Sequence, residues 1–280
     1  MKALGAADGT DDIFAVSAYC PITNLDHADM AYKWQFNGVN NYVKMNIGMV
    51  DNKMARSQNA DSLSQSQVTV SAQLKALFPQ YVNSLKLKDK NGAPLTLDEN
   101  GSFKDLVKYY VMASAQKVLV AQTDLSKLSW LKIENGKVTG LDFEAYVKYM
   151  QRQKTPPAFD GLDLSTPENQ EFGTDKIDKQ HFTAFSFEYS SVGAKRADEK
   201  LVKMMNPMDY IGQPDTKVPP HWRIRHGSKD KDTSLAISVI LGTVLQNKGS
   251  DVDLALPWNK PHSGDYDLEE LFTWTDKLCK

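Results

Sequence analysis

The chain has 280 residues and a mass of 31.3 kDa, and its 33 basic and 35 acidic residues leave a formal net charge of −2. This balance disfavours nucleic acids and anionic membranes as partners, because both attract proteins through an excess of basic residues. Hydrophobic residues make up 41% of the sequence, which is enough to fill a core and excludes a mainly disordered chain.

Cysteine content and hydropathy narrow the class of protein further. The two cysteines, Cys20 and Cys279, cannot form a disulfide framework, and neither lies in a spacing typical of zinc ligands. No apolar run approaches the roughly 20 residues that a membrane-spanning helix needs. We therefore expect a soluble, cytoplasmic protein without a metal or cofactor, whose partner is a small molecule.

The first element in chain order is a strand. Residues 13–20 are almost continuously apolar, as in a strand covered on both faces of a parallel sheet. A buried helix turn is the competing interpretation. Pro21 cannot continue a helix and the preceding Ala-Asp-Gly sequence is typical of a turn, so the strand is favoured.

From about Asp29 to Asn206 the sequence has helical periodicity interrupted by loops. Apolar residues three and four positions apart predict amphipathic helices over residues 70–81, 103–119 and 141–150. Asn135-Gly136, between two short strand-like runs, predicts a hairpin. Residues 154–173 contain three prolines and form a predicted irregular loop, and loops of this length often carry functional residues.

Strands and helices alternate again after residue 220. The predicted order is a strand at residues 222–225, a helix at 236–244, a strand at 252–256 and a helix from 268 to 275. The last helix is expected to pack with its apolar residues inward, namely Leu268, Leu271, Phe272 and Thr275. This order indicates right-handed crossovers on a parallel sheet, so the predicted fold class is α/β.

Two polar residues directly follow the predicted carboxy-terminal strands. In sheets of this kind, catalytic groups collect beyond the carboxyl ends of the strands, where Asp230 and His262 are expected to lie side by side. A carboxylate that orients an imidazole forms two parts of a Ser-Asp-His triad, in the chain order of α/β-hydrolases. The alternatives are a surface histidine near a helix start and a solvated or capping aspartate.

The serine of such a triad is not evident in the sequence. No Gly-x-Ser-x-Gly motif occurs in the 280 residues. Ser114 and Lys117 match the Ser-x-x-Lys spacing, but they lie in a predicted helix stripe, and the same spacing recurs at Ser129 and Ser228, so a catalytic role is not indicated. Nucleotide-binding, zinc-protease and calcium-binding motifs are also missing from the sequence.

Residues 11–26, 221–233 and 256–267 closely resemble the bacterial tannases, which are α/β-hydrolase esterases, and the resemblance extends over essentially the whole chain. It implies a hydrolase core formed by residues 1–28 and 206–280, lacking the amino-terminal strands and interrupted by a large, mainly helical lid at residues 29–205. It further implies hydrolysis of galloyl esters to gallic acid through an acyl-serine intermediate.

The resemblance also assigns roles to individual residues. Asp230, in Arg225-His-Gly-Ser-Lys-Asp230, matches the family's triad acid, and His262, in Lys260-Pro-His-Ser-Gly264, matches its base. The hydroxyls of the gallate ring are held in the family by a lysine, a glutamate and a second aspartate. The matching residues are Lys154, Glu168 and Asp232, with Glu171 as a near competitor of Glu168. Without the resemblance, all of these would be interpreted as solvated loop charges.

The sequence departs from the family where the nucleophile and the first strands are expected. We therefore expect a carboxy-terminal portion that is inactive alone and that binds a missing amino-terminal half or self-associates through the exposed edge of its sheet. Alternatives are a feruloyl or other aryl esterase, and a non-catalytic phenolic-acid-binding or interaction fragment. Structural roles are expected for Cys20 and for the remaining histidines, His27, His181, His221 and His226.

Overall fold

The computed structural model describes residues 9, 12–50, 53–99 and 101–280. Its strands are β1 (Ala15–Tyr19), β2 (Asn41–Val50), β3 (Lys53–Ser62), β4 (Leu131–Glu134), β5 (Lys137–Leu141), β6 (His221–Arg225) and β7 (Asp251–Ala255). Its helices are α1 (Leu25–Gln35), α2 (Gln65–Ser84), α3 (Ser102–Val120), α4 (Phe143–Met150), α5 (Glu168–Glu171), α6 (Ala184–Glu188), α7 (Glu199–Met205), the short 3-10 helix η2 (Pro207–Asp209), α8 (Leu235–Asn247) and α9 (Leu268–Leu278).

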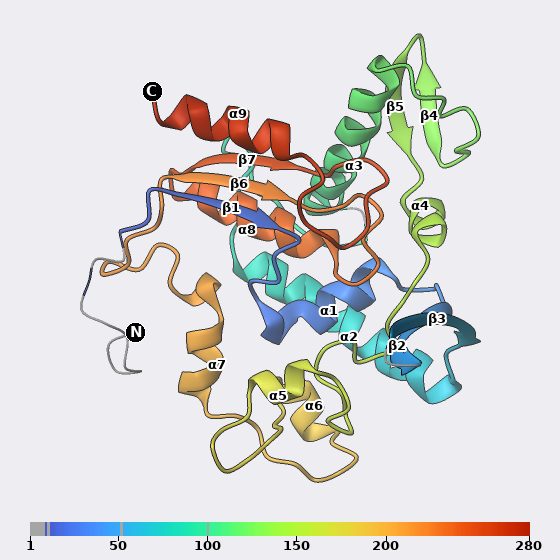
Figure 1. The fold of residues 1–280 in the computed structure, drawn as a ribbon, viewed down its shortest axis with the longest axis vertical. Helices are drawn as coiled ribbons and strands as arrows, with labels where there is room; N and C mark the ends of the chain where they lie inside the picture. The colour runs from blue at the N-terminus through green and yellow to red at the C-terminus, as the bar shows by residue number, and fades with distance from the viewer. Residues whose placement is uncertain (1–8, 10–11, 51–52, 100) are drawn as a thin grey trace.

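Three parallel strands form the main sheet, in the order β1-β6-β7 (Figure 1). Strands β1 and β6 pair along their whole length, from Ala15 opposite His221 to Tyr19 opposite Arg225. Because α8 connects β6 to β7, the chain has the strand-helix-strand order expected of an α/β protein. The predicted α/β fold class and the positions of these three strands are confirmed.

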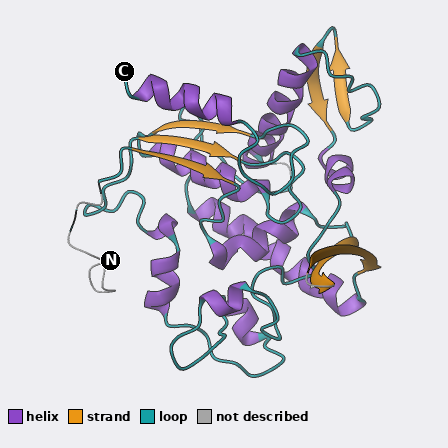
Figure 2. Ribbon diagram, in the orientation of Figure 1, coloured by secondary structure: helices purple, strands orange, loops and turns teal. Residues whose placement is uncertain are grey.

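The predicted helical region is only partly helical. Helices α2, α3 and α4 and the β4–β5 hairpin lie where periodicity and Asn135-Gly136 predicted them. The prediction missed a second antiparallel hairpin, β2–β3, which is separate from the main sheet (Figure 2). Residues 43, 45, 47 and 49 are apolar and alternate with other residues, which is a strand period of two that the search for helical spacing passed over.

The two faces of the main sheet differ in chemistry. Ile224 packs against Leu241 and Leu245 of α8 on one face. Successive strand residues point to opposite faces, so Arg223 and Arg225 face the side where α9 lies (Figure 1). The expectation that α9 buries an apolar face is wrong, because Phe272 is 62% exposed and no residue of this helix is buried.

A buried ion-pair network fastens the loop after β7 to the sheet. Asp267 accepts hydrogen bonds from the Tyr19 hydroxyl at 2.6 Å and from Nε of Arg225 at 3.0 Å, and it also pairs with Arg223. Arg225 binds the Asp253 carboxylate as well, at 2.7 Å. Because Arg223 is fully buried, its charge depends on these carboxylate partners. The network holds the loop that contains His262 close to β6.

We expect Asp267→Asn to destabilise the fold by about 3 kcal/mol, because it leaves two buried guanidinium groups without their shared carboxylate. Urea unfolding followed by circular dichroism measures this loss. Asp276→Asn, on the exposed side of α9, is the matched control and should change stability by less than about 0.5 kcal/mol. Equal effects of the two substitutions would contradict a stabilising role for the network.

One hydrophobic core joins the main sheet to the helical region. It includes Trp34 and Phe78 from α1 and α2 together with Leu235 and Ile240 from α8. The region that precedes β6 is therefore packed directly onto the helix that supports the main sheet. Among the described residues, no helix is both long and apolar enough to span a bilayer.

Candidate functional site

The loops that follow β6 and β7 lie against each other because of a glycine. A Cβ atom on Gly227 would approach the carbonyl oxygens of Lys260 and Pro261 to 2.2 and 2.4 Å, so only glycine fits there. Backbone hydrogen bonds between the loops, from Ser228 N to Pro257 O and from Lys229 N to Lys260 O, are both 2.9 Å long. These contacts bring the segment with Asp230 next to the segment with His262.

Asp230 and His262 form a direct hydrogen bond. Nδ1 of His262 lies 2.8 Å from Oδ2 of Asp230, and Asp230 is fully buried. The other carboxylate oxygen accepts the backbone N–H groups of Asp232 at 2.8 Å and Thr233 at 3.1 Å, and the Thr233 hydroxyl donates to Oδ2 at 3.0 Å. Because the carboxylate is anchored by these donors, it fixes the orientation of the imidazole.

The charges of the pair stabilise each other. Burial opposes ionisation of Asp230, but the nearby histidines outweigh it and hold the pKa of Asp230 below its ordinary value. The hydrogen bond that His262 donates to Asp230, helped by the hydrogen bond with Cys20, raises the pKa of His262 to about 10. Its Nδ1–H is directed at Asp230, so Nε2 is the ring nitrogen that can exchange a proton with another group. In this geometry the carboxylate can orient the imidazole, and the imidazole can accept a proton at Nε2.

A second histidine, His226, reaches the same carboxylate. Its Nε2 lies 3.0 Å from Oδ2 of Asp230, its Nδ1 lies 2.8 Å from the Ser238 hydroxyl, and it is fully buried. Burial lowers the pKa of His226, but the charge and hydrogen bond of Asp230 outweigh burial and raise it. The sequence offered no signal for this contact beyond a spacing of four residues in a loop.

Cys20 lies next to the pair, at the end of β1. It is buried, it has a φ of 45°, and its Sγ is 3.4 Å from the Tyr266 hydroxyl. Burial raises the pKa of the thiol, but the hydrogen bonds with His262 and Tyr266 and the charge of His226 together outweigh burial and lower it. Cys20 is buried, as a structural role in packing predicts, but it also contacts the imidazole of His262, which that prediction did not include.

Lys154 and Glu168 form an ion pair in the proline-containing loop. Nζ of Lys154 is 3.4 Å from Oε1 of Glu168, and the same ammonium lies 4.2 Å from the centre of the Phe159 ring. Burial raises the pKa of Glu168, with Lys154 opposing it. Oε2 of Glu168 is buried and has no hydrogen-bond partner within the described part of the chain. Glu171, the competing residue, is exposed on the same short helix.

Two side chains, those of Gln153 and Tyr32, connect the segment of Lys154 to the segment that follows Asp230. The amide of Gln153 donates to Oδ1 of Asp232 at 2.8 Å. The buried hydroxyl of Tyr32 donates to the carbonyl of Lys231 at 2.7 Å and accepts the backbone N–H of Lys154 at 3.1 Å. Residues 153–154 are thereby held against residues 231–232, which follow Asp230 directly.

Two sets of ligand atoms in this region are close enough to surround a cation. The atoms of each set lie within 4.8 Å of one another, and the sets are Cys20, His226 and Asp230, and Asp230, Asp232 and His262. Sequence spacing did not reveal either set, since their members come from different elements. In the structure, Oδ2 of Asp230 is already paired with Nε2 of His226 and Nδ1 of His262.

Solved structures of similar proteins match the chain over its full length. Tannase from Lactobacillus plantarum has a TM-score of 0.95 and 47% identity over 100% of this chain and 60% of that protein. A complex of tannin acyl hydrolase with ethyl gallate has a TM-score of 0.91, 47% identity and coverages of 100% and 59%. Tannase from Fusobacterium nucleatum has a TM-score of 0.92, 46% identity and coverages of 100% and 62%.

No protein-family model and no curated protein matches the chain. The chain spans about three fifths of the length of the tannases whose structures it matches. At 46–47% identity over all 280 residues, the likeness extends well beyond a shared fold. The resemblance of the chain to the bacterial tannases is therefore confirmed over the part of those proteins that it spans.

Proposed function

We propose that this chain supplies the acid–base pair and the phenol-binding residues of a serine esterase that hydrolyses galloyl esters to gallic acid. The observation that carries the proposal is the 2.8 Å contact between Nδ1 of His262 and the fully buried carboxylate of Asp230. Two of the similar structures support the substrate class, since one is a complex with ethyl gallate and another a complex with 3,4-dihydroxybenzoate.

In this proposal the imidazole of His262 takes the proton of a serine hydroxyl, which attacks the ester carbonyl. The same nitrogen then returns the proton to the departing alcohol, and a second cycle with water releases gallic acid. Asp230 keeps the imidazole in the required tautomer. The pKa of His262 is raised to about 10, so the base form grows as pH rises, and hydrolysis should accelerate with it.

We propose that Lys154, Glu168 and Asp232 bind the hydroxyls of the gallate ring. A buried acceptor such as Oε2 of Glu168 is costly when unpaired, and a phenolic O–H would satisfy it. The ammonium of Lys154 can donate to a phenolic oxygen, while Asp232 offers a second acceptor. An esterase for feruloyl groups needs fewer polar groups around the ring, so this polar environment favours galloyl esters.

We propose that residues 1–28 and 206–280 are part of an α/β-hydrolase core and that residues 29–205 form its lid. Under this division Asp230, Asp232 and His262 belong to the core, and Lys154 and Glu168 belong to the lid. The hydrogen bond from Tyr32 to the carbonyl of Lys231 supports a lid fastened against the site. A substrate ring would then be enclosed between the two parts.

The nucleophilic serine, in this proposal, comes from polypeptide outside the 280 residues, since these contain no Gly-x-Ser-x-Gly motif. The exposed apolar surface at the sheet supports such a partner segment. Phe14, just before the edge strand β1, is 57% exposed, and Phe272 of α9 is 62% exposed. A second copy of the chain is the alternative occupant of this surface.

Methyl gallate tests the proposal with the 280-residue chain itself. We expect calorimetry to detect binding and chromatography to detect no gallic acid, because losing the nucleophile of a serine hydrolase costs about 10⁶ in turnover. Hydrolysis of methyl gallate by the chain alone that is lost in a folded His262→Ala variant would contradict the external nucleophile. Absence of binding, with the fold intact by circular dichroism, would contradict the assigned phenol-binding residues.

A further inference from the structure

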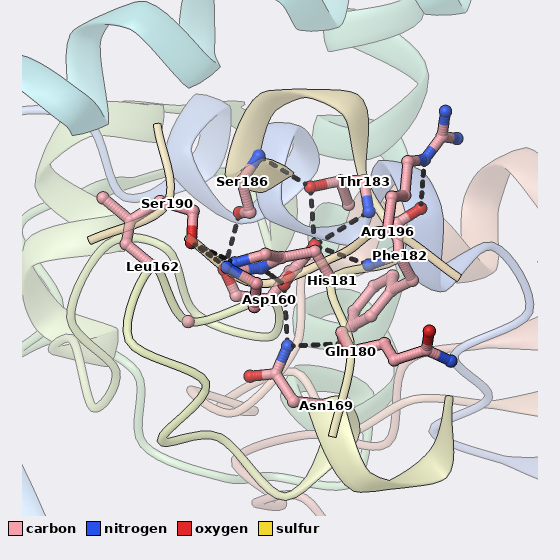
Figure 3. A network of polar contacts seen from close by, with 12 residues as sticks. Asp160, Leu162, Asn169, Gln180, His181, Phe182, Thr183, Ser186, Ser190 and Arg196 are labelled. Atoms are coloured by element: carbon pink, nitrogen blue, oxygen red, sulfur yellow. Dashed lines mark hydrogen bonds and ion pairs between the residues drawn. The ribbon is translucent and has the colours of Figure 1, made fainter. Parts of the chain in front are cut away.

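A carboxylate, an imidazole and a hydroxyl are linked by hydrogen bonds in the segment before β6, away from the site described above. His181 lies between two partners, with Nδ1 2.7 Å from Oδ1 of Asp160 and Nε2 2.9 Å from the hydroxyl of Ser190 (Figure 3). Asp160 and His181 are both fully buried. The spacing of these residues in the sequence, 21 and 9 positions, matched no known motif, and His181 was expected to be structural.

The hydrogen bonds around Asp160 determine which ring nitrogen of His181 bears a proton. The carboxylate of Asp160 accepts a hydrogen bond from the side-chain amide of Asn169 at 2.7 Å. It also accepts hydrogen bonds from the backbone N–H groups of Phe182 and Thr183 at 2.9 and 2.8 Å (Figure 3). All of these are donors, so Asp160 is an ionised acceptor and Nδ1 of His181 must donate to it. Nε2 of a neutral imidazole is then an acceptor, and the Ser190 hydroxyl donates to it. These are the roles of a Ser-His-Asp triad.

Ser190 is less buried than Asp160 and His181. Ser190 is half-buried in a loop whose next three residues, 191–193, are exposed. The backbone N–H of Ala194 donates to its Oγ at 3.2 Å, which favours negative charge on that oxygen. Tyr189, the residue before Ser190, lines a neighbouring cavity of about 630 Å³ together with Phe185 and Arg196, although Ser190 is not part of its wall.

We propose that Ser190 is a second nucleophile, activated by His181 and Asp160, which reacts with small activated esters. Its Oγ forms a bond to the acyl carbon while its proton passes to Nε2 of His181. The bond between that carbon and the leaving oxygen then breaks, and the leaving oxygen takes the proton. Water repeats the sequence and releases the acid. Neither Asp230 nor His262 takes part, so this site is independent of the proposed galloyl-ester site.

A fluorophosphonate probe tests the proposal on the intact 280-residue chain. Such a probe phosphonylates an activated serine, forming an oxygen–phosphorus bond and releasing fluoride with the serine's proton. We expect mass spectrometry of the digested chain to place the adduct on Ser190, at a rate at least about 100-fold above that of the adjacent Ser191. Ser191 is the internal reference because its hydroxyl donates to the carbonyl of Leu162 at 3.0 Å and has no histidine partner among the residues that the structure describes.

Two variants complete the test. Ser190→Ala should abolish labelling and the slow hydrolysis of p-nitrophenyl acetate, while the matched Ser191→Ala variant should retain both. Circular dichroism shows whether each variant is folded. Equal labelling of Ser190 and Ser191 in the folded chain, or labelling that survives Ser190→Ala, would overturn the proposal. Neither measurement uses a galloyl ester, so the result is independent of whether the proposed function holds.

Discussion

Replacing Asp230 with asparagine is expected to lower the pKa of His262 from about 10 toward its ordinary value near 6.5, with Cys20 still holding it above that value. The hydrogen bond that the imidazole donates to the Asp230 carboxylate is the largest cause of the raised value, and an amide carries no charge to stabilise the imidazolium. Asparagine has nearly the same shape, so the backbone N–H groups of Asp232 and Thr233 keep an acceptor. Titration of the His262 ring protons by NMR measures the change directly.

The same substitution should alter how stability depends on pH. The pKa of His262 is higher in the folded chain than the ordinary unfolded value near 6.5, so folding favours its protonated form. Its stabilising contribution is complete below about pH 6.5 and is lost as pH rises to about 10. Wild type should therefore lose more unfolding free energy than Asp230→Asn between about pH 6 and about pH 10, as measured with urea.

Asp251→Asn is the matched control for this experiment. Asp251 also faces a histidine, since its carboxylate is 3.2 Å from Nδ1 of His221, but it is 72% exposed, so solvent screens the pair. This variant should leave the titration of His262 unchanged. If His262 titrates near 6.5 in the wild-type chain, or if Asp230→Asn leaves its pKa near 10, the buried ion pair does not exist in solution.

The main sheet could be predicted from the sequence because its strands are long apolar or alternating runs bounded by prolines and turns. The neighbouring positions of the loops with Asp230 and His262 followed from the strand-helix-strand order alone. Their hydrogen bond depends on a finer feature, the close approach of Gly227 to the carbonyls of Lys260 and Pro261, which no periodicity contains.

Contacts made within irregular loops were the part of the structure that the sequence could not predict. His226 reaches Asp230, and Ser190 reaches His181, through the exact path of loops that have no repeating pattern. The apolar stripe of α9 predicted a burial that the structure does not have: Phe272 is 62% exposed, and that side of the sheet presents Arg223 and Arg225. An amphipathic pattern predicts which face of a helix is apolar. It does not predict which segment, if any, covers that face.

Gallate binding is expected to distinguish Glu168 from Glu171. Glu168→Gln should weaken binding of gallate at least about tenfold, because a charge-assisted hydrogen bond to a phenolic hydroxyl contributes about 1.5–3 kcal/mol and the neutral amide retains only part of it. Glu171→Gln should leave the affinity unchanged, since Glu171 is exposed while Glu168 is held by Lys154. Isothermal titration calorimetry measures both dissociation constants.

Lys154→Met should have a larger effect, about 10- to 100-fold, because it removes the ammonium that donates to the ring and leaves the carboxylate of Glu168 buried without a counter-charge. Benzoate, which has no ring hydroxyls, should bind weakly to wild type and lose little in either variant. Equal losses for gallate and benzoate would mean that Lys154 and Glu168 act through the shape of the loop. A selective loss for gallate means that these two side chains contact the hydroxyls, with the buried Oε2 of Glu168 as one acceptor.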